Sequence, residues 1–198
     1  MTHPVTYPVW VDGAWLDVPV PEMSGEAIVV PNVNAIVLSP ARDAILLQRR
    51  DKPGEPVRGK LEVPGGRWRA GEPPEDAVVR EVKEETGLDI VELVSDTGRL
   101  ELAGNRAIGY VHPVAVVNGV GGSYPSLHVL FECVATGEPV AQPGETADPR
   151  WWPVDEVERL LGDDPDEFVD QTRGMLTVYF AVTADRRSGP RCPEGHRP

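Results

Sequence analysis

Three glutamates near the middle of this 198-residue chain have the residue type and spacing to bind a metal ion. Glu81, Glu84 and Glu85 stand at positions i, i+3 and i+4, so on a helix all three project from one side. Like charges at this spacing repel, and neither Arg80 nor Lys83 lies three or four residues from Glu81 to relieve them. Mg²⁺ would relieve them, because it takes carboxylate oxygens and keeps waters that phosphate oxygens can replace. The competing interpretation is an acidic, solvated helix face.

A loop followed by a helix must position these glutamates. The loop is rich in glycine and proline, which cannot continue a strand. Pro73 and Pro74 suit the start of a helix, and Glu75 and Asp76 place negative charge at the positive end of its dipole. Gly87 is then typical of the residue that ends a helix.

The whole stretch from Gly66 to Leu88 resembles the Nudix box, the pattern G-x5-E-x7-R-E-U-x-E-E-x-G-U, in which U is a bulky aliphatic residue. Residue types at so many fixed offsets are a specific signal, and they favour the metal site over the solvated face. The segment Gly59–Gly66 also resembles the lead-in of MutT-type members. Every specified position of the box is filled, by Gly66, Glu72, Arg80, Glu81, Val82, Glu84, Glu85, Gly87 and Leu88.

This resemblance implies an enzyme that hydrolyses the pyrophosphate bond of a nucleoside diphosphate derivative or a nucleoside triphosphate. It implies Mg²⁺ as cofactor, with Mn²⁺ as a substitute, and a small phosphorylated nucleotide-type substrate. The alternative is a non-catalytic Nudix module that senses a nucleotide without cleaving it. Non-catalytic members usually lose carboxylates of the box, and this chain keeps all of them.

The resemblance also implies roles for the acidic residues. Glu81, Glu84 and Glu85 match the metal ligands of the family, and any of them or Glu145 could be the general base, since a carboxylate needs only one water within reach. Glu145 lies six residues before Trp151, much as a loop carboxylate does in MutT-like members, and is a candidate metal ligand.

Three further residues complete the predicted site. Gly66 could offer its backbone carbonyl to a metal, because the absent side chain lets an ion approach. Arg80 belongs to the catalytic set through the box, where the family pairs this arginine with Glu72 or a nearby carboxylate to hold loop and helix together. Arg50 is the candidate substrate-binding residue, since arginines at this distance before the box often lie near the substrate phosphates; a solvated strand end is the alternative.

Composition limits the partners. The chain has 40% hydrophobic and 26% charged residues, which is ordinary for a globular protein. Its formal net charge of −13 argues against duplex nucleic acid and anionic membranes, which proteins reach through basic patches. No signal peptide or membrane-spanning run is evident, so we expect a cytoplasmic protein.

The N-terminal residues 1–25 predict a short β-hairpin appendage. Two apolar segments, 9–11 and 14–16, flank an Asp12-Gly13 dipeptide, which is typical of a tight hairpin turn. A hairpin this short needs a surface to cover it. Trp10 and Trp15 could pack either on the core of the same chain or on a second subunit, which would make the protein a homodimer.

Alternating strands and helices predict an α+β fold with a mixed sheet, and the α-β-α sandwich is what the Nudix resemblance adds. The main domain is expected at 26–185 and a disordered tail at 186–198, which is charged and rich in glycine and proline. Extra length relative to small family members is expected at 102–106 and 118–126. Strands are predicted at 32–39, 44–49, 88–95, 107–117 and 127–135, and helices from 155 and over 166–183.

Overall fold

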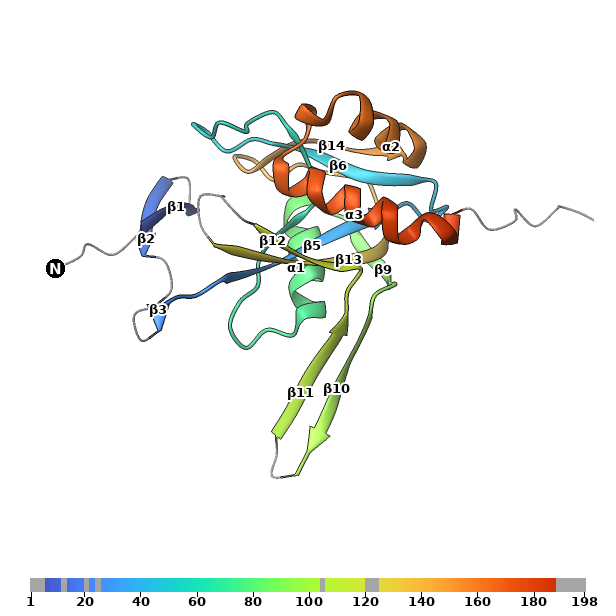
Figure 1. Ribbon diagram of the computed structural model, residues 1–198. Helices are drawn as coiled ribbons and strands as arrows, with labels where there is room; N and C mark the ends of the chain where they lie inside the picture. The colour runs from blue at the N-terminus through green and yellow to red at the C-terminus, as the bar shows by residue number, and fades with distance from the viewer. Residues whose placement is uncertain are drawn as a thin grey trace, which may run out of the picture.

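A computed structural model describes residues 6–11, 14–19, 22–23, 26–103, 106–119 and 125–187. A mixed sheet with the strand order β12-β13-β5-β6-β14 forms its centre (Figure 1). The two central strands β13 and β5 run parallel, and the other neighbours in this order are antiparallel. The strand bounds are β5 Val30–Leu38, β6 Ala44–Arg50, β12 Ala115–Gly119, β13 Ser126–Thr136 and β14 Thr146–Pro153.

Three short strands extend this sheet and bring the predicted site to it. β7 (Leu61–Glu62) pairs with β6, β8 (Gly65–Arg67) pairs with β5, and β9 (Asp89–Leu93) pairs with β13. The loop of the predicted box therefore leaves from β8, beside the centre of the sheet.

Helices cover both faces of the sheet. The helix α1 (Pro74–Thr86) packs its buried residues Ala77, Val78 and Val82 on one face. The other face is covered by α2 (Val154–Asp163) and α3 (Asp170–Arg187), which follow one another through the 3-10 turn η1 (Pro165–Glu167). This arrangement confirms the predicted α+β class and the α-β-α sandwich. None of the described helices is long and apolar enough to cross a bilayer.

The predicted strand over 107–117 is wrong. The chain forms two strands there, β11 (Arg106–His112) and β12, with Pro113 between them. Proline has no N–H to give to a ladder, so pairing breaks at this point. β11 pairs with β10 (Asp96–Leu102), and together they make an arm that projects from the body (Figure 1).

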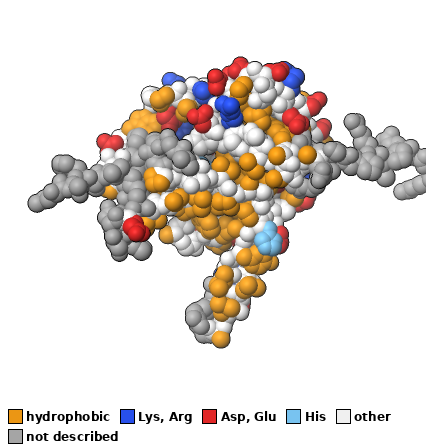
Figure 2. Space-filling view, in the orientation of Figure 1, with side chains coloured by type: hydrophobic (Ala, Val, Ile, Leu, Met, Phe, Trp, Pro, Cys, Tyr) orange, Lys and Arg blue, Asp and Glu red, His pale blue; other side chains and the backbone are white. Residues whose placement is uncertain are grey.

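The extra length expected at 102–106 and 118–126 stays a prediction, and residues 104–105 and 120–124 lie outside the described residues. The first of these segments connects the two paired strands of the arm. The arm's large apolar side chains Leu100, Leu102, Ile108 and Tyr110 are exposed, and hydrophobic atoms run along it in the space-filling view (Figure 2).

The N-terminal hairpin is present as β1 (Thr6–Val11) and β2 (Ala14–Pro19), with Trp10 opposite Trp15 in its register. Asp12 and Gly13 lie outside the described residues. The Trp15 ring nitrogen donates to the carbonyl of Pro53 at 2.6 Å, so this side chain contacts a loop of its own chain. A two-residue pair, β3 (Glu22–Met23) with β4 (Glu26–Ala27), leads from the hairpin to the sheet.

The remaining elements follow the predicted order with shifted ends. β5 begins at Val30, so Pro31 lies inside the strand. The helix expected over 166–183 starts at Asp170, because Phe168 is in extended conformation after η1. It continues to Arg187, two residues past the expected domain end, and the rest of the predicted tail, 188–198, lies outside the described residues.

Candidate active site

The helix α1 ends where its sequence predicts. Gly87 has φ +71° in the left-handed region and its N–H donates to the Lys83 carbonyl. The Lys83 ammonium donates to the Gly87 carbonyl at 2.8 Å, which satisfies another terminal acceptor. The apolar stripe of α1 is turned to the sheet, so its glutamates are carried along the flank of the helix, beside β8.

Glu85 is buried, and two donors hold one oxygen of its carboxylate. Gln48 Nε2 donates to Glu85 Oε2 at 2.7 Å, and the Gly65 backbone N–H donates to the same oxygen at 3.1 Å. Burial, followed by the nearby Glu62 carboxylate, raises the pKa of Glu85 to about 8. Such a carboxylate is costly to keep charged without a cation, so a metal ion beside it would stabilise the ionised form.

Arg80 connects the loop to the helix. Its Nε and Nη2 donate to the two oxygens of Glu72 at 2.7 and 2.9 Å, which is the pairing expected from the box. Its Nη1 also contacts Glu81 and lies 3.3 Å from Glu84 Oε2. One guanidinium therefore fixes the loop and neutralises two of the three helix glutamates.

Gly66 is packed against Glu81. A Cβ atom at Gly66 would lie 2.5 Å from Glu81 Oε2, so any other residue would displace this carboxylate. The close approach also leaves the Gly66 backbone next to the acidic group, where the sequence predicted a carbonyl ligand.

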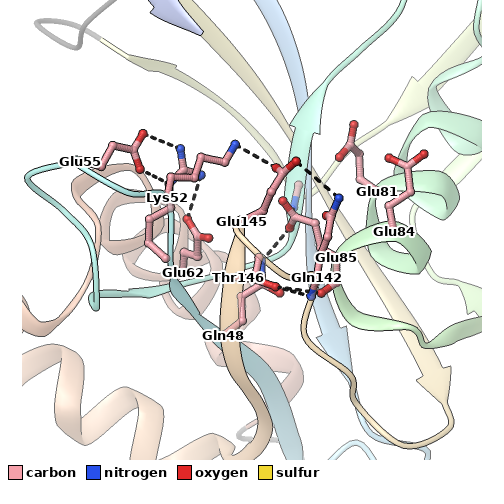
Figure 3. Close-up of polar contacts among 12 residues, drawn as sticks. Gln48, Lys52, Glu55, Glu62, Glu81, Glu84, Glu85, Gln142, Glu145 and Thr146 are labelled. Carbon is pink, nitrogen blue, oxygen red and sulfur yellow. Dashed lines mark hydrogen bonds and ion pairs between the residues drawn. The ribbon is translucent and has the colours of Figure 1, made fainter. Parts of the chain in front are cut away.

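The donor set fits a hard divalent cation, because carboxylate and carbonyl oxygens are its preferred ligands. Within the described residues, however, no three acidic, histidine or cysteine side chains are gathered around one point at which an ion would sit. Arg80 contacts Glu81 and Glu84, whereas Gln48 and Gly65 hold Glu85. Figure 3 shows Glu81 and Glu84 side by side on α1, apart from the hydrogen bonds around Glu85. Arg80 therefore pairs with Glu81 and Glu84 in this structure, and it is held by Glu72 as well.

Glu145 lines the same cavity as the helix glutamates, and its predicted role as a metal ligand stays a prediction. Lys52 Nζ lies 3.0 Å from Glu145 Oε2, and Gln142 Nε2 donates to Glu145 Oε1 at 3.4 Å. The loop before β14 is thereby tied to the neighbouring loop after β6, beside the pairing of Thr146 with Arg50 (Figure 3).

Arg50 lines the cavity but is already paired with carboxylates. Its Nε and Nη2 donate to Glu55 at 2.5 and 2.8 Å, and its Nη1 lies 3.4 Å from Glu62. A substrate phosphate would have to compete with both, so the predicted phosphate-binding role of Arg50 stays a prediction.

Sequence reasoning did not single out Glu62, Gln48 or Lys52. Burial raises the pKa of Glu62 to about 7, and one oxygen of Glu62 and one of Gln48 make no hydrogen bond within the described part of the chain. The available signal was a charge between Leu61 and Val63 in a buried strand, where an isolated carboxylate is rare.

These residues enclose one cavity of about 860 Å³, within the range of small-molecule sites. Six glutamates line it against four basic residues, Arg50, Lys52, Arg67 and Arg69. The acidic members are Glu55, Glu62, Glu81, Glu84, Glu85 and Glu145. Such a surplus of carboxylates around a cavity suits a cation-dependent anionic ligand better than a bare anion.

Comparison with known families decides the relationship. The family model for the NUDIX domain matches residues 29–172. The chain belongs to the Nudix family. The matched range runs from the start of β5 to the first residues of α3, so it spans the central sheet, α1 and α2, and all of the cavity lining except Trp15 and Met175.

Solved Nudix structures share the fold at low sequence identity. The MutT protein of Methanosarcina mazei Go1 is 20% identical with a TM-score of 0.57, over 82% of this chain and 96% of that one. The MutT NUDIX hydrolase of Burkholderia pseudomallei is 21% identical with a TM-score of 0.55, over 76% and 97%. The NUDIX domain of Shewanella oneidensis NrtR, solved with ADP ribose, is 15% identical with a TM-score of 0.58, over 85% and 94%.

A curated relative shares a shorter segment. A Caenorhabditis elegans protein named for the nudix hydrolases is 53% identical over 55 residues, which is 27% of this chain. The match spans only 14% of that relative, so it bears on the local segment rather than on the whole protein. Nudix hydrolases as a class use divalent metal ions, in agreement with the donor chemistry of the cavity.

Proposed function

We propose that this protein hydrolyses the pyrophosphate bond of a nucleoside diphosphate derivative or a nucleoside triphosphate, with Mg²⁺ as cofactor and Mn²⁺ as a substitute. The observation that carries the proposal is the placement of Glu81, Glu84 and Glu85 in one cavity with Glu145, beside the glycine loop that Arg80 ties to α1. The Shewanella domain solved with ADP ribose supports a nucleotide-type substrate.

In this proposal Glu81, Glu84 and Glu85, with the Gly66 carbonyl and Glu145, would hold the metal. A bound divalent ion supplies charge neutralisation on the pyrophosphate oxygens and a more acidic water. The oxygen of the attacking water bonds to phosphorus, and a carboxylate of the cavity accepts a proton from this water. The bond from that phosphorus to the bridging oxygen then breaks, and the two halves of the substrate leave as separate phosphates.

Arg80 acts as a positioning residue in this scheme. It keeps loop and helix in register through Glu72, so that the carboxylates meet the diphosphate at the right distance. Lys52 and Arg50, now paired with Glu145 and with Glu55 and Glu62, supply positive charge near the phosphates.

The test is a phosphate-release assay over nucleoside triphosphates, ADP-ribose, nucleotide sugars and dinucleotides, with and without Mg²⁺. We expect metal-dependent cleavage of at least one class, and loss of at least about 100-fold in kcat for Glu84→Gln and Glu85→Gln. Glu138→Gln, an exposed glutamate outside the cavity, is the matched control and should keep wild-type turnover.

The outcome also separates the enzyme from the nucleotide sensor. Wild-type turnover in both glutamine variants, with circular dichroism unchanged, would reject the ligand assignment. No cleavage of any class together with tight nucleotide binding would replace the hydrolase by the sensing module.

A further inference from the structure

The arm formed by β10 and β11 has two chemically different faces. In the register of this ribbon Leu100 lies opposite Ile108 and Gly98 lies opposite Tyr110, and Leu102 is two residues beyond Leu100. Because side chains alternate along a strand, all of these residues share one face. The exposed fraction is 55% for Leu100, 41% for Leu102, 53% for Ile108 and 37% for Tyr110, and we call these four side chains the apolar strip.

The opposite face of the arm is polar, and its base contacts the body. Thr97, Arg99 and Glu101 alternate with the apolar strip along β10, and Arg99 Nε donates to Glu101 Oε1 at 2.6 Å. Val111, opposite Thr97, packs against the cluster that contains α1. The polar face is therefore suited to water and anchored at its base to its own chain, whereas the apolar strip faces the other way.

Tyr110 fills the gap that Gly98 leaves in this face. A Cβ atom at Gly98 would lie 2.6 Å from two carbons of the Tyr110 ring, so the ring lies directly over the glycine. An aromatic ring that covers a glycine across a ladder makes the face continuous. At the base of the arm the strip ends at His112 and Asp96, whose Nδ1 and Oδ2 atoms lie 3.3 Å apart. An apolar centre with a polar end has the composition of a small interface.

The arm stands apart from the central sheet. Its strands β10 and β11 pair with each other and with no other strand that the structure describes, and the ribbon projects from the body (Figure 1). A two-stranded ribbon is only marginally stable in water unless another surface packs on it. A partner that buries the apolar strip would therefore stabilise the arm as well as gain contact area.

The charge of the arm favours a second copy of this chain as that partner. Between residues 96 and 112 the sequence has two carboxylates, Asp96 and Glu101, and two arginines, Arg99 and Arg106, so the formal charges of the arm cancel. The whole chain, by contrast, has a net charge of −13. An arm without a basic excess does not attract an anionic membrane or nucleic acid. Two copies of so acidic a chain repel each other least where their neutral arms meet.

We propose that two copies of this chain associate through the apolar strips of their arms, which pack face to face about a two-fold axis. Each strip then meets an identical strip, as in other two-fold contacts. At about 200 Å² for a fully exposed large side chain, the four side chains expose roughly 400 Å² in each copy. This area is that of a weak, reversible dimer with a Kd of roughly 10 µM to 1 mM. The association needs neither metal nor substrate, so it is independent of the proposed function.

Sedimentation equilibrium of the full chain, in EDTA and without nucleotide, tests the association. Between roughly 10 µM and 1 mM the weight-average mass should rise from that of one chain toward that of two. Raising the salt concentration from about 0.05 M to about 0.5 M should strengthen the association, because salt screens the repulsion between the acidic bodies. A contact held by ion pairs would weaken instead.

Lysine substitutions in the strip test where the two copies meet. Leu100→Lys and Ile108→Lys each bury an ammonium in the contact and should weaken association at least about 10-fold. Both make the net charge less negative, so a loss cannot come from stronger repulsion between the bodies. Val182→Lys makes the same change of charge at a 54% exposed aliphatic residue of α3 and should associate like the wild type. Leu100→Thr, which places a β-branched residue in the strand, replaces Leu100→Lys if the latter fails to fold.

Hydrogen exchange locates the contact on the chain. The backbone amides of β10 and β11 should exchange more slowly as the wild-type protein is concentrated, and this change should be absent in Leu100→Lys. Three results would overturn the proposal: the mass of one chain at the highest concentration, unchanged association in the folded strip variants, or concentration-dependent protection only outside the arm. Association that is lost on removal of residues 1–25 but kept in the strip variants would place the interface at the N-terminal hairpin instead.

Discussion

At the scale of single residues, Arg80 is the point on which the acidic group depends. It is only 16% exposed in its side chain and meets Glu72, Glu81 and Glu84 with one guanidinium. Lysine keeps the charge but cannot make the paired contacts, because an ammonium lacks the planar fork.

We predict that Arg80→Lys lowers kcat roughly 100-fold through misplacement of the glutamates. Glu72→Gln should lower kcat less. The loss of transition-state free energy in the double variant should be smaller than the sum of the two single losses, because both substitutions break the same Arg80–Glu72 contact. Steady-state kinetics on the best substrate of the panel measures this. Arg159→Lys, in the surface pair with Asp163, is the control. Full additivity would show that Arg80 acts independently of Glu72.

His128 makes stability depend on pH in a defined direction. Its pKa is lowered in the folded state by burial, so the unfolded chain takes up the proton first as the pH falls. The stability contribution of neutral His128 is thus complete above its unfolded pKa, near 6.5, and is lost as the pH falls toward the folded value.

Urea unfolding from roughly pH 7.5 to roughly pH 5 checks this. Glu62 and Glu85, whose pKa values are raised, contribute alike in the wild type and in His128→Gln, which has no imidazole to protonate. The free energy of unfolding of the wild type minus that of His128→Gln should therefore decrease as the pH falls. His112→Gln, at an exposed histidine, should follow the wild type. If the free energy of unfolding of the wild type and of His128→Gln changed in parallel with pH, the lowering of the His128 pKa by burial would be contradicted.

At the scale of elements, local signals predicted α1 and the central strands β5, β6 and β13 to within two residues, but they merged β11 and β12 into one strand. Proline at the start, acids in the first turn and Gly87 at the end all act within a few residues, and the helix has these bounds. The break at Pro113 was visible in the sequence, but the pairing of β11 with β10 instead of the central sheet depends on distant partners. The same limit applies to the site, since strand pairing in the sheet places Gln48 against Glu85 and brings the charge of Glu62 near it.

The two glycines at 87 and 174 should respond oppositely to alanine. Gly87→Ala should cost about 1–2 kcal/mol, because Gly87 has φ +71° and alanine disfavours the left-handed region. Gly174→Ala, inside α3 with nothing within 4 Å of the added Cβ, should stabilise by about 0.5–1 kcal/mol. Urea unfolding of both variants measures whether the free energy of unfolding falls or rises relative to the wild type. A loss in Gly174→Ala would mean that α3 bends at this residue.

At the scale of the whole molecule, the sandwich brings segments that are distant in the sequence to one cavity. Charged groups come from the end of β6 and the loop after it, β7, β8 with its loop, α1, the loop before β14 and the start of α3. Only the box among them has a fixed spacing, so the sequence predicts the acidic helix directly and the remaining walls through the family resemblance.

The homodimer stays a prediction. Trp15 contacts the loop at Pro53 of its own chain, which gives the hairpin one role without a partner. Sedimentation of the full chain and of a variant lacking residues 1–25 tests whether the hairpin also forms a dimer interface. Dimer mass in the full chain and monomer mass in the truncated one would support a hairpin interface, whereas equal masses would reject it.

The central claim is that Glu81, Glu84 and Glu85 bind a divalent cation beside Gly66. The most direct measurement is anomalous diffraction from crystals soaked in Mn²⁺, with a non-hydrolysable nucleotide present. We predict an anomalous peak bounded by these carboxylates, with Arg80 released from Glu81 and Glu84 but still bound to Glu72. The account would be contradicted by a crystal in which the nucleotide is fully occupied, no anomalous peak lies at these carboxylates, and Arg80 still contacts Glu72, Glu81 and Glu84.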